Sequence, residues 1–360
     1  MAKNQKSGKK NIAHTIFIDG LSGMALGLFA TLIVGTILAQ ISGYISGPVG
    51  NLLLVVGKTA QLLTGAGIGC GVAMKLGQTA PLVTISAAIC GMVGAYAKVI
   101  LAGGFFTDNA FGITPPGEPL GAFVAAIAGI GIGRLVSGKT GIDILLTPIC
   151  CVLVGCAAGL FVGPYITRFM NWLGYLVNWG TIQQPFIMGI IVSVLMGIFL
   201  TLPISSAAIG VSLGLSGLAA GAATAGCCAN MIGFAVASYR ENKVGGLVAQ
   251  GLGTSMLQIP NIIRHPQIWI PAIISSAVLG PVSTMLFKIE SNAVGSGMGT
   301  AGLVGPIMTY NTMAPNGNAA MVLGVILLMY FILPAIISLS ISEGMRRAGW
   351  IKHGYMKLDI

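Results

Sequence analysis

The feature that most constrains this chain is a series of apolar runs, each long enough to cross a lipid bilayer. The first reads TIFIDGLSGMALGLFATLIVGTILAQ, and similar runs recur along 360 residues, of which 55% are hydrophobic and only 7% are charged. A soluble domain carries charge on about a quarter of its residues, whereas a membrane helix needs about 20 consecutive apolar residues. Short alternating segments would indicate a membrane barrel. The runs therefore predict an all-α, polytopic membrane protein.

The apolar runs predict about ten transmembrane helices. The predicted spans are 16–40, 50–73, 81–101, 119–136, 144–163, 184–203, 206–236, 244–262, 268–288 and 319–341. The run 244–262 fits a span least well, because it contains Gln250, Gln258 and Asn261.

Aromatic residues indicate where the chain meets the membrane surface. The segment near 164–183 contains Trp172 and Trp179, so we expect either a helix in the headgroup region or a plain linker between two spans. The other two tryptophans, Trp269 and Trp350, are also expected at the interface.

The basic residues predict the orientation of the chain. Lysine and arginine concentrate in cytoplasmic segments. Ten crossings place both termini on one side, together with Arg346 and Arg347, and leave Arg240 and Lys243 on the other side. More basic residues then fall on the side of the termini, which predicts that both termini are cytoplasmic.

Three other classes of function are not favoured. The net charge of +10 comes from residues at the ends of the spans, as membrane anchoring requires, so we expect no nucleic-acid partner. The seven cysteines lie inside apolar runs without metal-ligand spacing, which predicts packing residues and no metal site. Because no Walker loop, H-E-x-x-H or Gly-x-Ser-x-Gly motif occurs, we expect neither an enzyme nor a cofactor.

Short motifs recur in the same order in the two halves of the chain. GLSGMALG at 20–27 returns as GLSGLAAG at 214–221, and ISAAICG at 85–91 returns as ISSAVLG at 274–280. Chance matches are frequent in sequence rich in Gly and Ala, but the conserved order predicts two parallel repeats. The predicted divisions are a first four-helix repeat, two connecting helices and a second four-helix repeat, at residues 1–140, 141–203 and 204–360.

Glycine-rich interruptions occupy corresponding places in the two predicted repeats, near 101–119 and near 290–318. Each ends in a Pro-x-Gly-polar element, PPGE in the first and PNGN in the second. Irregular backbone at membrane depth is tolerated only where protein buries it or where it lines a cavity. Glycine also lets a ligand approach the backbone closely. We therefore predict two re-entrant segments that build a solute site, with plain external loops as the alternative.

Candidate solute contacts lie in these interruptions. Glu118 is the acidic residue best placed for a role at membrane depth, although a solvated loop carboxylate is the alternative. The other candidates offer neutral hydrogen-bonding groups, for which helix capping and turn formation are the alternative: Asn292, Thr300, Asn311, Thr312, Asn316 and Asn318. Arg264 and His265 form a corner that is either an interface anchor or a gating and coupling element.

Glycines spaced four residues apart predict close helix packing. Such pairs are Gly23–Gly27, Gly67–Gly71 and Gly217–Gly221. These spacings let helix backbones approach each other, either within the fold or across a homodimer.

Two segments resemble a known family. GTSMLQIPNIIRHPQIWIPAIISSAVLGP (253–281), followed by GSGMGTAGLVGPI (295–307), resembles the PfoR-type bacterial membrane proteins. These are similar to the EIIC permease component of the sugar phosphotransferase system. The resemblance covers nearly the whole chain and implies about ten helices, a bacterial plasma membrane and a solute path. Glu118-Pro119 also resembles the Glu-Pro of the Gly-Ile-Thr-Glu-Pro sugar-binding motif of glucose-type EIIC proteins, although other residues precede it here.

The resemblance and the interruptions together give two functional hypotheses. The first is a permease that moves a small polar solute, a sugar or an organic anion, by alternating access between the repeats. The alternative is a membrane sensor that binds a solute and controls gene expression through a partner. The short terminal segments offer little surface for signalling, which favours transport. Because no segment resembles an EIIA or EIIB domain, any phosphorylating subunits would be separate chains.

Overall fold

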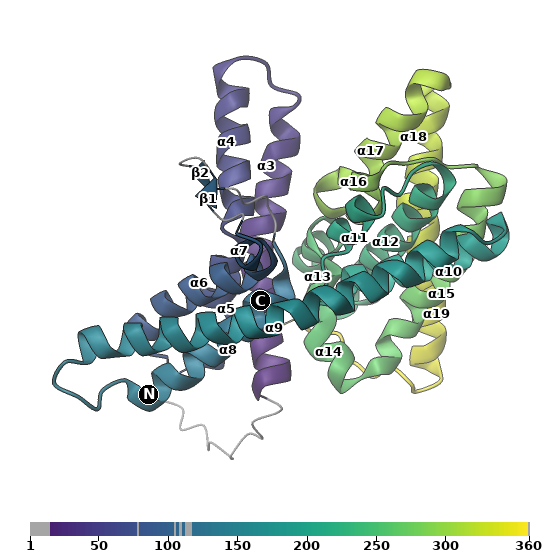
Figure 1. Cartoon of the computed structure of the whole chain (residues 1–360). Helices are drawn as coiled ribbons and strands as arrows, with labels where there is room; N and C mark the ends of the chain where they lie inside the picture. Colours follow the sequence, from purple (N-terminus) through teal and green to yellow (C-terminus); the bar gives the residue numbers. More distant parts are fainter. Residues whose placement is uncertain (1–14, 78, 104–105, 108–109, 112–116, 359–360) are drawn as a thin grey trace.

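The computed structural model describes residues 15–77, 79–103, 106–107, 110–111 and 117–358, and helices dominate these residues (Figure 1). The residues outside this description include 104–105, 108–109 and 112–116, about half of the predicted re-entrant segment near 101–119. Two short strands, β1 (Phe106–Thr107) and β2 (Ala110–Phe111), pair antiparallel there. The letter α denotes an α-helix, and η denotes a short π- or 3₁₀-helical stretch.

The first half of the chain forms long helices separated by short turns. Its elements are η1 (Thr15–Gly20), α2 (Leu21–Leu28), η2 (Phe29–Ile33), α3 (Val34–Ser42), α4 (Pro48–Leu62), α5 (Thr64–Leu76), α6 (Pro81–Ala95), α7 (Ala97–Leu101), α8 (Pro119–Val136), α9 (Asp143–Thr181) and α10 (Pro185–Thr201). Four of these helices begin at a proline, which suits the first helical position because its missing N–H has no partner to lose.

The second half is more broken. Its elements are α11 (Ser206–Ser212), α12 (Gly217–Ala237), α13 (Tyr239–Val248), η3 (Ala249–Gly253), η4 (Ser255–Gln258), α14 (Ile259–Arg264), η5 (Pro266–Trp269), α15 (Ile270–Pro281), η6 (Val282–Leu286), α16 (Ala293–Ser296), η7 (Ala301–Leu303), α17 (Val304–Met313), η8 (Ala314–Asn316), α18 (Ala319–Leu327), η9 (Leu328–Ile332) and α19 (Leu333–Arg347).

Several helices are long and apolar enough to cross a membrane. The described residues contain 6 such helices, or up to 7 if α4 and α5, which bend by 55° at their junction, form one span. Two shorter apolar helices, α6 and α10, come in addition. The chain is thus an all-helical, multi-pass membrane protein, but the predicted number of ten spans is not confirmed.

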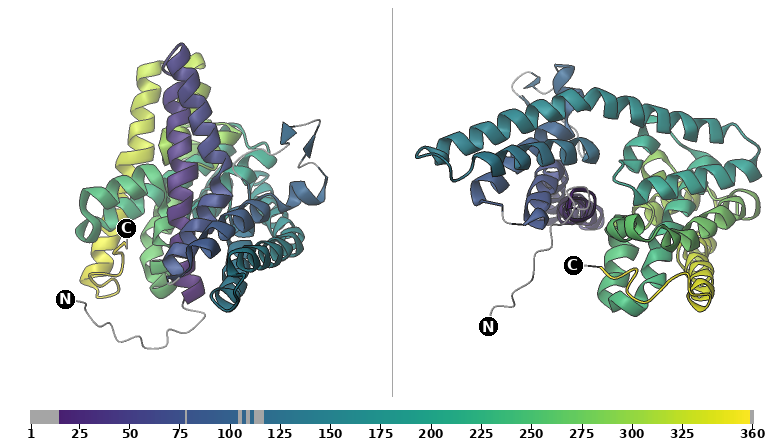
Figure 2. Two further views of the ribbon diagram at one scale, coloured as in Figure 1. Left: turned by 90° about the vertical axis from the view of Figure 1, so that its left-hand side faces the viewer. Right: turned by 90° about the horizontal axis from the view of Figure 1, so that it is seen from below.

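Helix α9 is one continuous helix that runs along both halves of the molecule (Figures 1 and 2). Its 39 residues extend about 58 Å at 1.5 Å per residue, which exceeds the roughly 30 Å hydrocarbon core of a bilayer. The predicted span 144–163 and the segment near 164–183 are therefore parts of a single helix. Trp172 and Trp179 on it are exposed, as a contact with lipid headgroups requires.

Close glycine contacts hold the first span against the bent one. A Cβ at Gly23 would overlap the backbone of Gly71, and a Cβ at Gly27 would overlap the carbonyl oxygen of Gly67. The close packing predicted from these two glycine pairs is confirmed. The glycine motif of the second half packs differently, because Gly221 meets the carbonyl of Ile289. The two repeats thus stay a prediction.

Ion pairs join the start of α13 to the end of α19. Arg346 Nη2 lies 2.9 Å from Glu241 Oε1, with both side chains almost fully buried, and Arg240 Nη2 lies 2.7 Å from Glu343 Oε2. Residues 240–243 therefore lie at the same end of the molecule as Arg346 and Arg347. The expectation that Arg240 and Lys243 lie on the opposite side is wrong.

The C-terminal strap, which we define as residues 349–358, explains this error. It crosses both ends of the segment 239–265: Asn242 Nδ2 donates to the carbonyl of Met356 (2.8 Å), and the His265 ring stacks on Tyr355 with 3.6 Å between ring centroids. The predicted span 244–262 thus enters and leaves at one end of the bundle and does not cross it. A run of this length and polarity does not distinguish a crossing from a folded-back segment.

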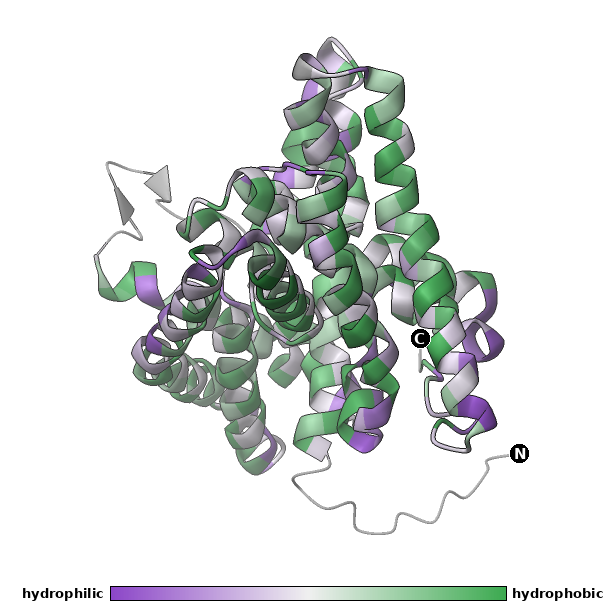
Figure 3. Cartoon of the chain, turned by 90° about the vertical axis from the view of Figure 1, so that its right-hand side faces the viewer, coloured by the Kyte–Doolittle hydropathy of each residue, from purple (hydrophilic) through white to green (hydrophobic). Residues whose placement is uncertain are grey.

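The start of the first span lies at this same end, because α14 contacts η1. Coloured by hydropathy, the bundle is apolar along most of its helices and hydrophilic near the C-terminus (Figure 3). With Arg240 and Lys243 at this end, the excess of basic residues on the side of the termini is larger than the sequence predicts. The expectation of cytoplasmic termini stays a prediction, and the larger excess strengthens it.

Gly27→Ala should destabilise the protein, because the added methyl group has no space beside Gly67. Overpacking of this kind costs about 1–3 kcal/mol, which a lower midpoint of thermal unfolding in detergent would show. Gly131→Ala is the control, because a Cβ there meets nothing within 4 Å. Equal midpoints for the two variants would contradict the close packing.

Single cysteines at Lys243 and Lys352, in a background without native cysteines, should react with an impermeant thiol reagent from the same side of oriented vesicles. A cysteine at Lys288, at the opposite end of α15, should react from the other side. Labelling of positions 243 and 352 from different sides would show that the segment 239–265 crosses the membrane.

Candidate functional site

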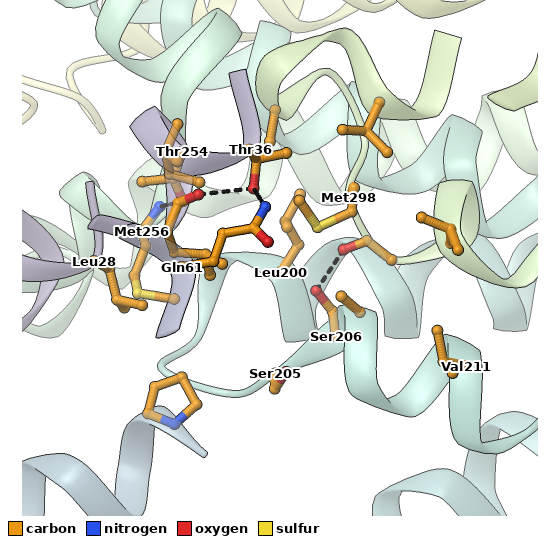
Figure 4. Close-up of a pocket in the computed structure, with 18 of the residues that line it drawn as sticks. Leu28, Thr36, Gln61, Leu200, Ser205, Ser206, Val211, Thr254, Met256 and Met298 are labelled. Carbon is orange, nitrogen blue, oxygen red and sulfur yellow. Dashed lines mark hydrogen bonds between the residues drawn. The ribbon is translucent and has the colours of Figure 1, made fainter. Parts of the chain in front are cut away.

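A cavity of about 350 Å³ lies between the first span and the second half of the chain (Figure 4). The first span contributes one wall through α3, and α4 adds a second. The loop between α10 and α11, the η4 turn and the α16–η7 region complete it. The polar lining residues are Thr36, Gln40, Lys58, Gln61, Ser205, Ser206 and Thr254, and Pro119 at the start of α8 also reaches the cavity.

The η4 turn brings the folded-back segment 239–265 to the cavity. Thr254 ends the preceding helical stretch in an extended conformation, and its hydroxyl accepts a hydrogen bond from the Met256 amide (3.2 Å). Ser255 Oγ lies 2.8 Å from Thr201 Oγ1 at the end of α10. These contacts satisfy polar groups where the helix breaks, so this turn stays in place in an apolar interior.

The segment near 290–318 folds in from the opposite end of the bundle. Beside the start of α12, Ser291 N donates to the carbonyl of Gly217 (3.3 Å). Further along, Thr300 Oγ1 donates to Met231 Sδ (3.4 Å), well towards the other end of α12. The chain then returns, since Thr309 Oγ1 donates to Ser291 Oγ (3.1 Å). Gly299, with φ of 53° beside Cys227, permits the reversal.

A buried hydrogen-bond network centred on Asn230 lies next to the η4 turn of the cavity, to which Thr201 connects it. Asn230 Oδ1 accepts from the indole N–H of Trp269 (2.9 Å), and Asn230 Nδ2 donates to Ser276 Oγ (3.0 Å). Thr201 Oγ1 donates to Asn230 Oδ1 at 3.3 Å. The network joins α10, α12 and α15. Trp269, expected at the interface, thus has its polar edge in the protein interior.

The cavity offers mainly neutral hydrogen-bonding groups among apolar walls. Gln61 Nε2 donates to Thr36 Oγ1 (3.1 Å), which fixes the amide at the cavity wall. Ser206 Oγ donates to the carbonyl of Gly297 (2.7 Å). Lys58 supplies one positive charge. Within the described lining no aromatic ring and no carboxylate occurs, so the cavity provides few polar groups for orientation and much apolar surface.

Glu118 lies beside this cavity, directly before Pro119. Its backbone N–H donates to the carbonyl of Ala95 (2.8 Å). Its Oε1 atom is buried and has no hydrogen-bond partner among the described residues. Burial raises the pKa of the Glu118 carboxyl to about 7. An unpaired buried carboxyl is costly when it is charged, so this residue differs from the solvated loop carboxylate that was the alternative.

The other predicted contacts are dispersed along the second segment. Thr300 is fully buried next to Ala301 of the cavity lining. Asn292 and Asn318 cap α16 and α18, as the capping alternative expects. Thr312 and Asn318 line a separate cavity of about 340 Å³ near Lys288 and Glu290. Asn311 is exposed, and the side chain of Asn316 lies outside the described residues.

Arg264 and His265 end the folded-back segment, one short helix (α14) beyond its tip at η4. Arg264 is exposed at the C-terminus of α14, and His265 stacks on Tyr355 of the strap. The structure does not bring them to the central cavity.

Sequence reasoning missed most of the residues that line the cavity. Thr36, Gln40 and Gln61 lie within long apolar spans, and Ser205 and Ser206 lie in the loop after α10. A polar side chain inside a predicted span is a signal for function. That signal was available for Gln40 and Gln61.

The family model of the phosphotransferase system EIIC component matches residues 18–358. The chain belongs to the EIIC family. This EIIC chain is therefore a membrane permease of the sugar-transport class, and the expected similarity to the EIIC component is confirmed. The assignment to the PfoR-type proteins stays a prediction. EIIC chains are transport components of the membrane, which agrees with the expectation of a protein that is not an enzyme. A comparison with curated proteins gave no match.

The raised pKa of Glu118 predicts a pH-dependent stability. The folded state favours the neutral carboxyl, whereas the unfolded chain ionises near the ordinary value of 4.5. Stability should therefore fall as the pH rises from about 5 to 7 and level off above that range. In Glu118→Gln, which cannot ionise, this part of the dependence should disappear. Parallel curves of unfolding midpoint against pH for the two proteins would contradict the burial of this carboxyl.

Proposed function

We propose that this EIIC chain carries a small polar solute through the central cavity by alternating access. The observation that supports this best is that two folded segments approach the cavity from opposite ends of the bundle. Thr254 and Met256 come from the end that holds the C-terminal strap, and Gly297 and Met298 come from the other end. A site between two such segments can open to either side as one of them moves.

The lining chemistry favours a solute with hydroxyl or carboxylate groups, a sugar or an organic anion. Gln61, Ser205 and Thr254 provide neutral donors and acceptors, and Lys58 provides a single positive charge. We propose that Glu118 turns towards the solute and accepts hydrogen bonds from its hydroxyl groups, as the resemblance to the Glu-Pro motif implies. Thr300 supports the adjacent wall.

The outer residues fit an approach route better than the central site. Thr312 and Asn318 line the separate cavity at the end opposite the strap, and Asn292, Asn311 and Asn316 belong to the same segment. We propose that they contact the solute before it reaches the centre. Arg264 and His265 remain candidates for gating, because the stacking of His265 on Tyr355 holds this end of the folded-back segment against the strap.

The proposal also covers the membrane, the orientation and the assembly of the chain. The folded-back segment 239–265 and the segment near 290–318 re-enter the bilayer of a bacterial plasma membrane, and both termini are cytoplasmic. Phosphorylating subunits are separate chains, and a homodimer is the proposed assembly.

Uptake of labelled sugars and sugar acids into proteoliposomes tests this function. Gln61→Leu keeps the side-chain volume but removes the amide from the cavity wall. The loss of one solute hydrogen bond should raise the half-saturating concentration about twofold to twelvefold, since such a bond contributes about 0.5–1.5 kcal/mol. Gln183→Leu, which removes an amide after α9 and away from the cavity, is the control.

Saturable binding without flux under any gradient or with any phosphorylating subunit would overturn the transport proposal. Equal effects of the Gln61 and Gln183 substitutions would leave transport standing but would exclude this cavity as the solute site.

A further inference from the structure

A second groove lies at the strap end of the bundle, away from the central cavity. It has a volume of about 560 Å³ and opens between the end of α12, the helix α13 and the last turns of α19. Val236, Leu247 and Leu339 form apolar walls, and Arg240, Glu343 and Arg347 lie at its charged part. Neither the solute path nor the Asn230 network uses these residues.

One face of the last helix connects this groove to the membrane-facing surface. Ile332, Ile336, Leu339, Glu343 and Arg347 follow one another at intervals of three or four residues, so they lie on one side of the helix. Ile332, Ile336 and Leu339 are 49%, 56% and 43% exposed. The face is therefore apolar within the span and becomes charged where the span ends.

The charges of the groove leave one positive charge in excess. Glu343 accepts from Arg240 at 2.7 Å, while Arg240 keeps 63% of its side chain exposed. The nearby Arg346 is held by the buried Glu241 and by the carbonyl of Ala237. Arg347 remains exposed at the mouth of the groove. Guanidinium groups bind phosphate oxygens in a bidentate way.

We propose that this groove binds an anionic phospholipid from the surrounding bilayer. The lipid phosphate contacts Arg347 and the exposed side of Arg240, and an acyl chain lies along Leu339, Ile336 and Ile332. Tyr239, which also lines the groove, lies at the headgroup level, where tyrosine is enriched. The apolar face favours a lipid over a soluble phosphate, because a soluble anion would leave it uncovered. Basic pockets between membrane helices bind anionic headgroups in this way.

Lipid binding can be measured by native mass spectrometry of the purified full chain in detergent. Phosphatidylglycerol should bind the wild-type protein more tightly than phosphatidylcholine. Arg347→Gln should weaken phosphatidylglycerol binding about fivefold, as about 1 kcal/mol per basic residue implies. Lys352→Gln is the matched control, because it removes one exposed charge at the same end without lining the groove.

A second variant separates lipid binding from general charge effects. Leu339→Gln keeps every charge but interrupts the apolar face, and it should also weaken phosphatidylglycerol binding. Unfolding midpoints without added lipid show that both variants are folded.

Three results would overturn the proposal. They are equal affinity for phosphatidylglycerol and phosphatidylcholine, equal losses in Arg347→Gln and Lys352→Gln, and unchanged binding in Leu339→Gln. Displacement of the lipid by an equal concentration of glycerol phosphate would show that the groove binds a soluble anion instead.

Discussion

The buried ion pair between Glu241 and Arg346 determines how the second half of this EIIC chain is arranged. A charged group inside a protein is tolerated when it is paired and further hydrogen-bonded, and Arg346 also donates to the carbonyl of Ala237. The pair places the ends of α12 and α19 side by side. Because both ends lie on one side, the chain between them crosses the bundle an even number of times. The helices α15 and α19 supply two crossings, so the segment 239–265 folds back.

Buried hydrogen bonds keep the folded-back segment in place. Its amide side chains bind the backbone of the strap: Gln258 Nε2 donates to the carbonyl of Met356 at 2.9 Å, and Asn261 Nδ2 donates to that of Lys357 at 2.9 Å. Leu358 then packs into the core of the first half with Met256 and Leu257. The strap thus links the base of the segment whose tip lines the cavity to the opposite half.

The polar residues in and around the cavity fall into two groups: some hold helices together, and others face the cavity. Asn230, Thr201 and Ser276 satisfy one another in the interior and hold three helices in register. Gln61 and Ser206 each use one bond to protein and leave further hydrogen-bonding capacity at the cavity wall. Glu118 is the exception, with one buried oxygen that has no partner among the described residues. It lies directly before Pro119, which lines the cavity.

The sequence by itself determined the membrane class, the helices and the close packing of Gly23 and Gly27 on Gly71 and Gly67, because hydropathy and glycine spacing are local properties. The segments 253–281 and 295–307 were also enough to indicate the family. Only the tertiary structure decided that residues 244–262 fold back, since their length and polarity suit a crossing equally well and the partners that settle it, Tyr355 and Met356, lie about a hundred residues away. For the same reason the sequence favoured Asn292 and Asn318, which cap helices, over Thr36 and Gln61, whose place at the cavity depends on contacts between distant spans.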